Sequence, residues 1–293
     1  MMENPMNETP ILAVIGGSGL YEFEDLKDVQ TIEVDTPFGK PSSPITLGTL
    51  QGKPVAFLAR HGIGHVLSPS EVPYRANIYA LKKLGIKRIV SVSACGSLRE
   101  AYEPGHILIP DQIFDYTHKR DRSFFGDGVV VHASVADPFC ASLSEILADS
   151  LEATGATYHK GGTYITIEGP RFSTKGESRL YRQWGIDIIG MTASPEVFLA
   201  REAEMCYTTM AHVTDYDVWH VSKEPVTVEM VVRTLMKNIS LAQETIKQMV
   251  TRINPDEPCG CENALQDALI TNPAYINQEA RERFSLLIGK YLK

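Results

Sequence analysis

Residues 161–195 read GGTYITIEGPRFSTKGESRLYRQWGIDIIGMTASP. Two β-rich runs, Thr163–Ile167 and Ile186–Ile189, flank a helical segment, and each run ends in a polar turn. Residues 174–177 (TKGE) match a capping box, which predicts a helix start, and Ser194-Pro195 predicts the cap and first residue of the next helix. The pattern predicts a β-α-β unit. Its turns are either plain charged loops or part of a ligand site, because ligands of α/β sheets bind at strand ends.

Composition narrows the class of protein. The chain has 293 residues, of which 43% are hydrophobic and 22% charged, as expected for a globular protein with a full core. The net charge of −8 argues against nucleic acid or anionic membranes as partners, although a locally positive pocket can still bind an anion. No apolar run approaches the roughly 20 residues that span a bilayer, and residues 1–10 do not resemble a secretory signal. We therefore expect a cytoplasmic protein.

The strand-like run Ile11–Ile15 ends in a glycine turn, GGSG. The turn is not a dinucleotide-binding motif, because the position that would need glycine is Glu22. Its exposed amides and the Ser18 hydroxyl are suited to an oxyanion. Alternatively, it is a tight turn without a ligand.

Two further strands end in groups that bind anions. The run Val55–Leu58 leads into Arg60 and His61, and the arginine fork of donors suits phosphate or carboxylate. The run Arg88–Val92 leads into residues 93–97 (SACGS), which offer hydroxyls and amides. With the glycine turn, three separate strand ends carry donors for an anion.

We expect no metal site. His61 and His65 have the i, i+4 spacing of a metal-binding pair on a helix, but Gly62 and Gly64 lie between them and disfavour a helix.

The rest of the chain continues the alternation of strands and helices. Further strands are expected at Thr31–Val34, Ile45–Leu50, Ile107–Pro110 and Cys206–Thr214, helices at Arg75–Leu84, at Pro138–Leu151 and from a Thr227 cap to Pro255, and a polar loop at Asp115–Gly128. Short connections between alternating elements predict a single α/β domain over residues 1–254. Residues 255–293 form an acidic C-terminal extension with two short helices, which we expect to pack on the same domain or on a neighbouring subunit.

The five cysteines fall into two groups. Cys95, Cys140 and Cys206 lie among apolar or small residues and are expected to be buried free thiols. Cys259 and Cys261 flank one glycine, too close for an ordinary structural disulfide. They are a redox-labile bridge, free surface thiols or a bridge to another subunit.

Seven motifs, in unbroken order from about Ile11 to about Val250, together resemble the 5′-methylthioadenosine phosphorylase family of trimeric purine nucleoside phosphorylases. They are GGSGLY, DTPFGKPS, ARHG, ACGSLRE, TIEGPRFS, MTASPE and VTDYDVW. The resemblance implies a single α/β domain with a twisted, mixed central β-sheet flanked by helices, and a homotrimer or a dimer of trimers. It also implies phosphate-dependent cleavage of 5′-methylthioadenosine to adenine and 5-methylthioribose 1-phosphate, in purine and methionine salvage. Phosphate would be a co-substrate, and no cofactor is expected.

The resemblance also assigns the site. It implies a phosphate site of Ser18, Arg60, His61, Ser93, Ala94 and Thr192. It implies base and sugar contacts from Asp217, Phe172, Met191, Thr214, Val228, Val231 and His132. In this assignment Met191 lies under the ribose, Phe172 packs on the purine, and His132 reaches in from a neighbouring subunit. Val228 and Val231 would line the methylthio pocket, although on their spacing alone they are plain helix core.

Asp215 and Asp217 are expected to determine which purine base is bound. Phosphate attacks the anomeric carbon while the purine leaves, so Asp215 is the expected catalytic residue, protonating N7 of the leaving base. Asp217 brings a like charge, and a closed pocket does not readily ionise both carboxyls. One protonated and one ionised carboxyl match N7 and the N6 amino group of adenine, whereas a 6-oxopurine presents two acceptors. A solvated acidic turn is the plain alternative for these residues.

Other functions remain open at this stage. The nearest rivals are a purine nucleoside phosphorylase with adenosine and inosine activity and a methylthioinosine phosphorylase. A nucleoside-binding protein without catalysis is the rival from another class, and it would not need the phosphate donors.

Overall fold

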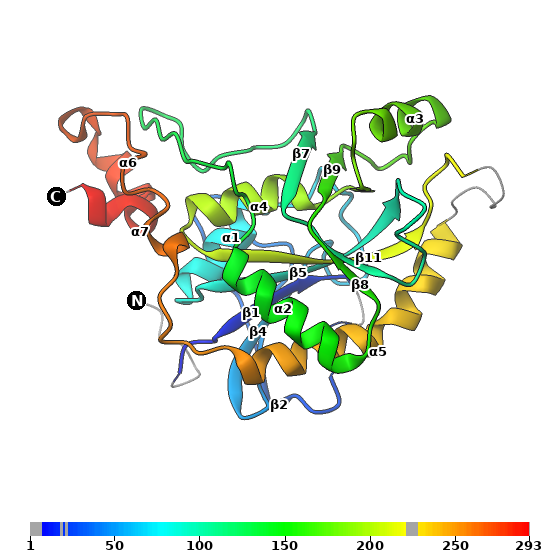
Figure 1. Ribbon diagram of the computed structural model, residues 1–293. Coiled ribbons are helices and arrows are strands. Elements are labelled where there is room, and N and C mark those ends of the chain that lie inside the picture. Colours follow the sequence, from blue (N-terminus) through cyan, green and yellow to red (C-terminus); the bar gives the residue numbers. More distant parts are fainter. Residues whose placement is uncertain (1–7, 18–19, 21–22, 221–227, 293) are drawn as a thin grey trace.

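A twisted, mixed β-sheet runs through the centre of the protein and is flanked by helices (Figure 1). The computed structural model describes residues 8–17, 20, 23–220 and 228–292, and within the helix of residues 228–252 it describes side chains at 228–229 and from 238 onwards. Ser18, Thr227 and the Val231 side chain, all named in the sequence analysis, lie outside this part of the chain. Within it, no helix is long and apolar enough to cross a bilayer.

The sheet is 11-stranded within the described residues. Its strands are β1 (Leu12–Gly16), β2 (Lys27–Ile32), β3 (Ile45–Leu50), β4 (Lys53–Ala59), β5 (Arg88–Ser97), β6 (Ile107–Ile109), β7 (Gln112–Tyr116), β8 (Tyr158–Lys160), β9 (Thr163–Ile167), β10 (Ile188–Gly190) and β11 (Cys206–Asp215). They follow the order β2-β3-β4-β1-β5-β10-β9-β7, and β11 pairs with β5 and β6, and β6 with β8. β1 is parallel to β4 and β5, and β11 is parallel to β5. The carboxyl ends of these four strands therefore meet at one edge.

The helices are α1 (Tyr74–Lys83), α2 (Ala141–Thr154), α3 (Lys175–Gln183), α4 (Ala193–Glu202), α5 (Val228–Arg252), α6 (Gln278–Arg283) and α7 (Ser285–Ile288), with 3-10 turns η1 (Gly260–Asn263), η2 (Pro273–Tyr275) and η3 (Gly289–Tyr291). The predicted capping box is confirmed: the Thr174 hydroxyl accepts from the Glu177 amide, and the Glu177 carboxylate accepts from the Thr174 amide. Gly155 ends α2 in the left-handed region, which glycine adopts without steric cost.

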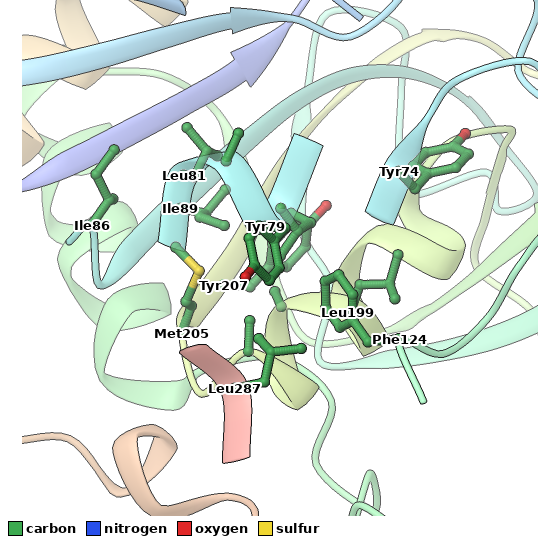
Figure 2. Close-up of a cluster of buried hydrophobic side chains, with 14 of the residues drawn as sticks. Tyr74, Tyr79, Leu81, Ile86, Ile89, Phe124, Leu199, Met205, Tyr207 and Leu287 are labelled. Atoms are coloured by element: carbon green, nitrogen blue, oxygen red, sulfur yellow. The ribbon is translucent and has the colours of Figure 1, made fainter. Parts of the chain in front are cut away.

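Side chains of the central strand β1 alternate between two cores on opposite faces of the sheet. On β1, Ala13 and Ile15 belong to the core with α1 and α4, whereas Leu12 and Val14 belong to the core with α2 and α5. Figure 2 shows part of the first core, where Tyr79, Phe124 and Tyr207 gather with aliphatic side chains.

The C-terminal extension packs on the first core. Phe284 is completely buried, and Leu287 of α7 lies among the side chains of that core (Figure 2). After α5 the chain runs to the opposite side of the molecule from α3, where α6 and α7 end it (Figure 1).

Four expectations from the sequence need correction. The first two residues of the expected polar loop, Asp115 and Tyr116, belong to β7, which pairs with β9. Strand β5 continues through residues 93–97 instead of ending at Val92. The strand expected at Thr31–Val34 is β2, which begins earlier in the chain. Ser194 has extended backbone angles but its hydroxyl has no hydrogen-bond partner among the described residues, so it does not cap α4 through its side chain.

Candidate active site

A cavity of about 540 Å³ opens at the edge where the parallel strands end. β1 leads to Gly17, β4 leads to Arg60, β5 contributes residues 93–96, and β11 contributes Thr214 and Asp215. The turn after β10 and the helix α5 close further sides. The three donor-rich strand ends, which are far apart in the sequence, therefore meet in one site.

Most of the site residues expected from the sequence line this cavity. They are Arg60, His61, Ser93, Ala94, Phe172, Met191, Thr192, Thr214, Asp215, Asp217 and Val228. His132 does not line the cavity of its own chain; it is exposed, and its amide donates to the Ala268 carbonyl at 2.8 Å. Its expected contact with a neighbouring subunit stays a prediction, as do the individual roles of the lining residues.

Arg60 is held by a partner that the sequence did not reveal. Its guanidinium makes two hydrogen bonds to Glu196, from Nε to Oε2 at 2.8 Å and from Nη2 to Oε1 at 3.0 Å. Nη2 also donates to Ser91 Oγ at 2.6 Å. The two side chains are 2% and 0% exposed, so the positive charge at this end of the cavity is balanced inside the protein. Glu196 lies in the MTASPE motif, but nothing local identifies it as the partner of a residue 136 positions away.

His61 is neutral near pH 7. Burial, together with the positive charge of Arg60, lowers the pKa of His61 to about 4. Its Nδ1 lies 2.9 Å from the Leu67 carbonyl, which only accepts hydrogen bonds, so Nδ1 carries the proton. Nε2 is then an acceptor, able to receive a hydrogen bond from a protonated phosphate oxygen. His65, the other member of the i, i+4 pair, stacks on the His61 ring with centroids 4.3 Å apart.

A β-bulge places the Asp215 carboxylate. The register of β11 against β5 shifts between Val213 and Asp215, which re-aims the side chain at the end of the strand. Asp215 Oδ2 accepts from the Thr214 hydroxyl and Oδ1 from the Asp217 amide, both at 2.7 Å. Burial nevertheless raises the pKa of Asp215 above its usual value.

Asp217 completes an acidic pair in the cavity. Its Oδ2 is buried without a hydrogen-bond partner among the described residues. Burial, with a further contribution from the Asp215 charge, raises the pKa of Asp217 to about 6. Because the pKa values of Asp215 and Asp217 are both raised, one proton is readily kept within the pair. The backbone at Asp217 has a positive φ of 50°, so the chain turns sharply just after the strand.

Gly96 fits under this pair only because it has no side chain. A Cβ atom at this position would lie 2.9 Å from Asp215 Oδ1, 3.1 Å from Ile189 Cγ2 and 3.3 Å from Asp217 Cβ. The motif ACGSLRE therefore has a steric reason for its glycine.

Arg120 was missed because it falls in the expected polar loop. It is buried, and its Nη1 donates to the carbonyls of Met191 and Ser194 at 2.6 and 2.7 Å. Its Nε pairs with Glu168 at 3.1 Å. Burial alone would raise the pKa of Glu168, but hydrogen bonds from Ser70, two backbone amides and Arg120 hold it at about 2. Arg120 thus fixes the turn that carries Met191 into the cavity.

His212 also lines the cavity and was read from the sequence as an ordinary strand residue. It is fully buried, and neither ring nitrogen has a hydrogen-bond partner among the described residues. Burial lowers the pKa of His212 to about 4, so the ring is neutral. A histidine within an otherwise apolar and small-residue strand was the one available signal.

Comparisons with known proteins show the family of this chain. Residues 11–253 match the model of the Phosphorylase superfamily. The chain is 52% identical to the S-methyl-5'-thioadenosine phosphorylase of Geobacter sulfurreducens, covering 96% of this chain and 99% of that protein, and 49% identical to the one from Koribacter versatilis, covering 96% of each.

Solved structures give the same picture. A methylthioadenosine phosphorylase from an antarctic soil metagenomic library has a TM-score of 0.91 at 47% identity, covering 96% of this chain and 99% of that one. The Schistosoma mansoni methylthioadenosine phosphorylase in complex with adenine has a TM-score of 0.85 at 35% identity, covering 89% and 99%.

Proposed function

The chain belongs to the Phosphorylase superfamily, and on that premise we propose that it cleaves 5′-methylthioadenosine with inorganic phosphate, releasing adenine and 5-methylthioribose 1-phosphate. The observation that supports this most is the single cavity that joins anion-binding groups to a buried aspartate pair. An enzyme of this kind is a pentosyltransferase. It needs an anion positioned at the sugar and a proton donor at the leaving base, and the cavity has candidates for both.

Phosphate would bind at the Arg60 end of the cavity. We assign its contacts to Ser18, Arg60, His61, Ser93, Ala94 and Thr192. The pairing of Arg60 with Glu196 means that the site does not present a bare positive charge. Affinity would then come from several neutral donors around one oriented guanidinium. The Ser93 hydroxyl supports this view, because it is buried without a hydrogen-bond partner among the described residues.

The nucleoside would extend from Met191 to the aspartate pair. Phe172 lines the cavity and is 37% exposed, so one face of its ring is available to a purine. Val228 is 67% exposed at the same cavity, which fits a methylthio contact better than helix core. We also assign Val231 to the methylthio group and Thr214 to the base.

The aspartate pair would protonate the leaving base. Negative charge develops on the purine as the glycosidic bond breaks, and a proton at N7 removes it. We assign that donation to Asp215, within a pair that keeps one proton because both pKa values are raised. Asp217 would accept a hydrogen bond from the N6 amino group. This arrangement favours adenine over a 6-oxopurine.

The assembly is proposed to be a homotrimer, alone or as a dimer of trimers, in the cytoplasm. An exposed aromatic group of Phe114, Tyr116 and Trp184 supports an interface, because large aromatic side chains are enriched at such surfaces. In such an assembly His132, which does not line the cavity of its own chain, would reach the cavity of a neighbouring subunit. We further propose that the reaction needs no cofactor, with phosphate as co-substrate, and serves purine and methionine salvage.

Incubation with methylthioadenosine, with and without phosphate, tests the proposed function. Free adenine that forms only with phosphate supports a phosphorylase. Adenine release without phosphate would make the protein a hydrolase, and no release under either condition would favour a nucleoside-binding protein.

A further inference from the structure

Four of the five cysteines gather at one point that lies outside the active-site cavity. The sulfurs of Cys140, Cys206, Cys259 and Cys261 all lie within 4.8 Å of one another. All are free thiols, so no bridge joins Cys259 to Cys261. Cys261 is buried, and the alternative of two free surface thiols is therefore wrong for this residue. The remaining cysteine, Cys95, belongs to the active-site cavity.

Three separate parts of the chain bring these sulfurs together. Cys140 is the N-cap residue of α2, Cys206 is the first residue of β11, and Cys259 and Cys261 belong to the turn η1 in the C-terminal extension. The backbone fixes the first two, because the Cys140 amide donates to the Tyr207 carbonyl at 2.8 Å. The extension adds the other two sulfurs from a single short turn. The cluster therefore depends on tertiary structure and not on one flexible loop.

The spacing of the sulfurs suits a tetrahedral metal ion. Four sulfurs at about 2.3 Å from a zinc ion lie about 3.8 Å from one another. Cys140 Sγ and Cys259 Sγ are already 3.6 Å apart, and the full set needs only small movements to close. Four protein sulfurs leave no open position, which is the arrangement of structural zinc sites rather than catalytic ones.

Hydrogen-bond donors surround the sulfurs. The Leu143 amide donates to Cys140 Sγ at 3.5 Å, and Arg201 Nη1 donates to Cys261 Sγ at 3.7 Å. The Ser142 hydroxyl lies 3.3 Å from Cys140 Sγ and 3.5 Å from Cys259 Sγ. A zinc ion with four thiolates carries a net negative charge, and a guanidinium and the N-terminal end of α2 both offset it.

We propose that Cys140, Cys206, Cys259 and Cys261 form a structural zinc site that ties the C-terminal extension to the phosphorylase domain. Thiolates are soft ligands, and a tetrahedral set of four selects zinc among the common divalent ions. On binding, each of the four thiols releases its proton to solvent and forms one sulfur–zinc bond. The ion lies outside the active-site cavity, so it affects the stability of the folded protein and the packing of residues 255–293 on the domain.

Metal content of the protein tests the proposal directly. The full chain is purified with a reductant, supplied with zinc chloride and dialysed against metal-free buffer. We expect about one zinc per chain, and cobalt in its place should give the visible absorption of a tetrahedral thiolate site. Alkylation of the native protein should then modify fewer cysteines with zinc bound than after a chelator has removed the ion.

Serine variants locate the site. Cys259→Ser and Cys261→Ser should reduce bound zinc to background, whereas the matched control Cys95→Ser removes a buried thiol outside the cluster and should retain the ion. Cys259 is the least buried of the four, so its variant is the one expected to disturb the fold least.

Three results would overturn the proposal. They are free thiols with no bound zinc in the wild type, disulfides among the four cysteines after reductive purification, and iron or copper bound in place of zinc. Each of them is a wild-type measurement and does not depend on a variant folding.

Discussion

The guanidinium of Arg60 lies side-on against the Glu196 carboxylate, with two nitrogen–oxygen distances of 2.8 and 3.0 Å between almost fully buried side chains. Removing one member of a buried pair leaves the other charge uncompensated, at a cost of about 3–5 kcal/mol in the free energy of unfolding. The pair also orients the guanidinium at the end of the cavity where we propose that phosphate binds. Stability and phosphate binding are therefore linked through the same two residues.

Arg60→Ala should weaken the use of phosphate more than that of methylthioadenosine. Loss of one charge-assisted contact of about 1.5–3 kcal/mol predicts a rise of roughly tenfold or more in the KM for phosphate. Steady-state kinetics with each substrate varied separately measures this. Arg88→Ala is the matched control, because Arg88 is a buried arginine that donates to the carbonyls of Asn254 and Glu257, away from the cavity. A normal KM for phosphate in the Arg60 variant would refute the assignment.

Asp217→Asn should shift base preference towards 6-oxopurines. The asparagine amide can donate a hydrogen bond to O6 of the base, whereas an ionised carboxylate repels that oxygen. The amide also cannot share the proton of the aspartate pair. The ratio of kcat/KM for methylthioadenosine to kcat/KM for inosine should fall by about tenfold or more, the equivalent of one hydrogen bond gained or lost. An unchanged ratio would show that this side chain does not read the base.

Asp217 should also make stability depend on pH. Its pKa is raised by burial to about 6 in the folded protein, above the usual value of about 3.9, so the folded state holds the proton more tightly than the unfolded state. Stability from this group is then greatest below about pH 4 and is lost as the pH rises to about 6, by roughly 3 kcal/mol in all. Urea unfolding of wild type and Asp217→Asn between pH 4 and 7 isolates this contribution. Parallel pH dependences in the two proteins would contradict it.

Gly96→Ala should reduce activity through the position of Asp215. The added methyl group meets the carboxylate oxygen and cannot be accommodated without moving it. A displacement of about 1 Å at a reacting group costs on the order of a hundredfold in rate. Gly289→Ala is the control, because a Cβ there meets nothing within 4 Å. If kcat/KM stays within about twofold of wild type in the Gly96 variant, the close approach has no catalytic importance.

Local sequence patterns predicted many of the strands and helices correctly. Strand runs such as Ile45–Leu50 and the capping box at Thr174 were confirmed, because propensity and capping depend on neighbours within a few residues. The strand at Gln112–Tyr116 was missed because it closely follows the strand expected at Ile107–Pro110 and its last two residues begin the expected polar loop. Its pairing with β9 is not local.

The order of the elements, the family and the residue types at the strand ends follow from the amino-acid sequence alone. Which of those groups meet depends on the tertiary structure. The partner of Arg60, the bulge that aims Asp215 and the meeting of Cys140 with Cys259 all join residues through sheet order and register. Register is set by the packing of the whole sheet against its helices, and no window of the sequence contains that information.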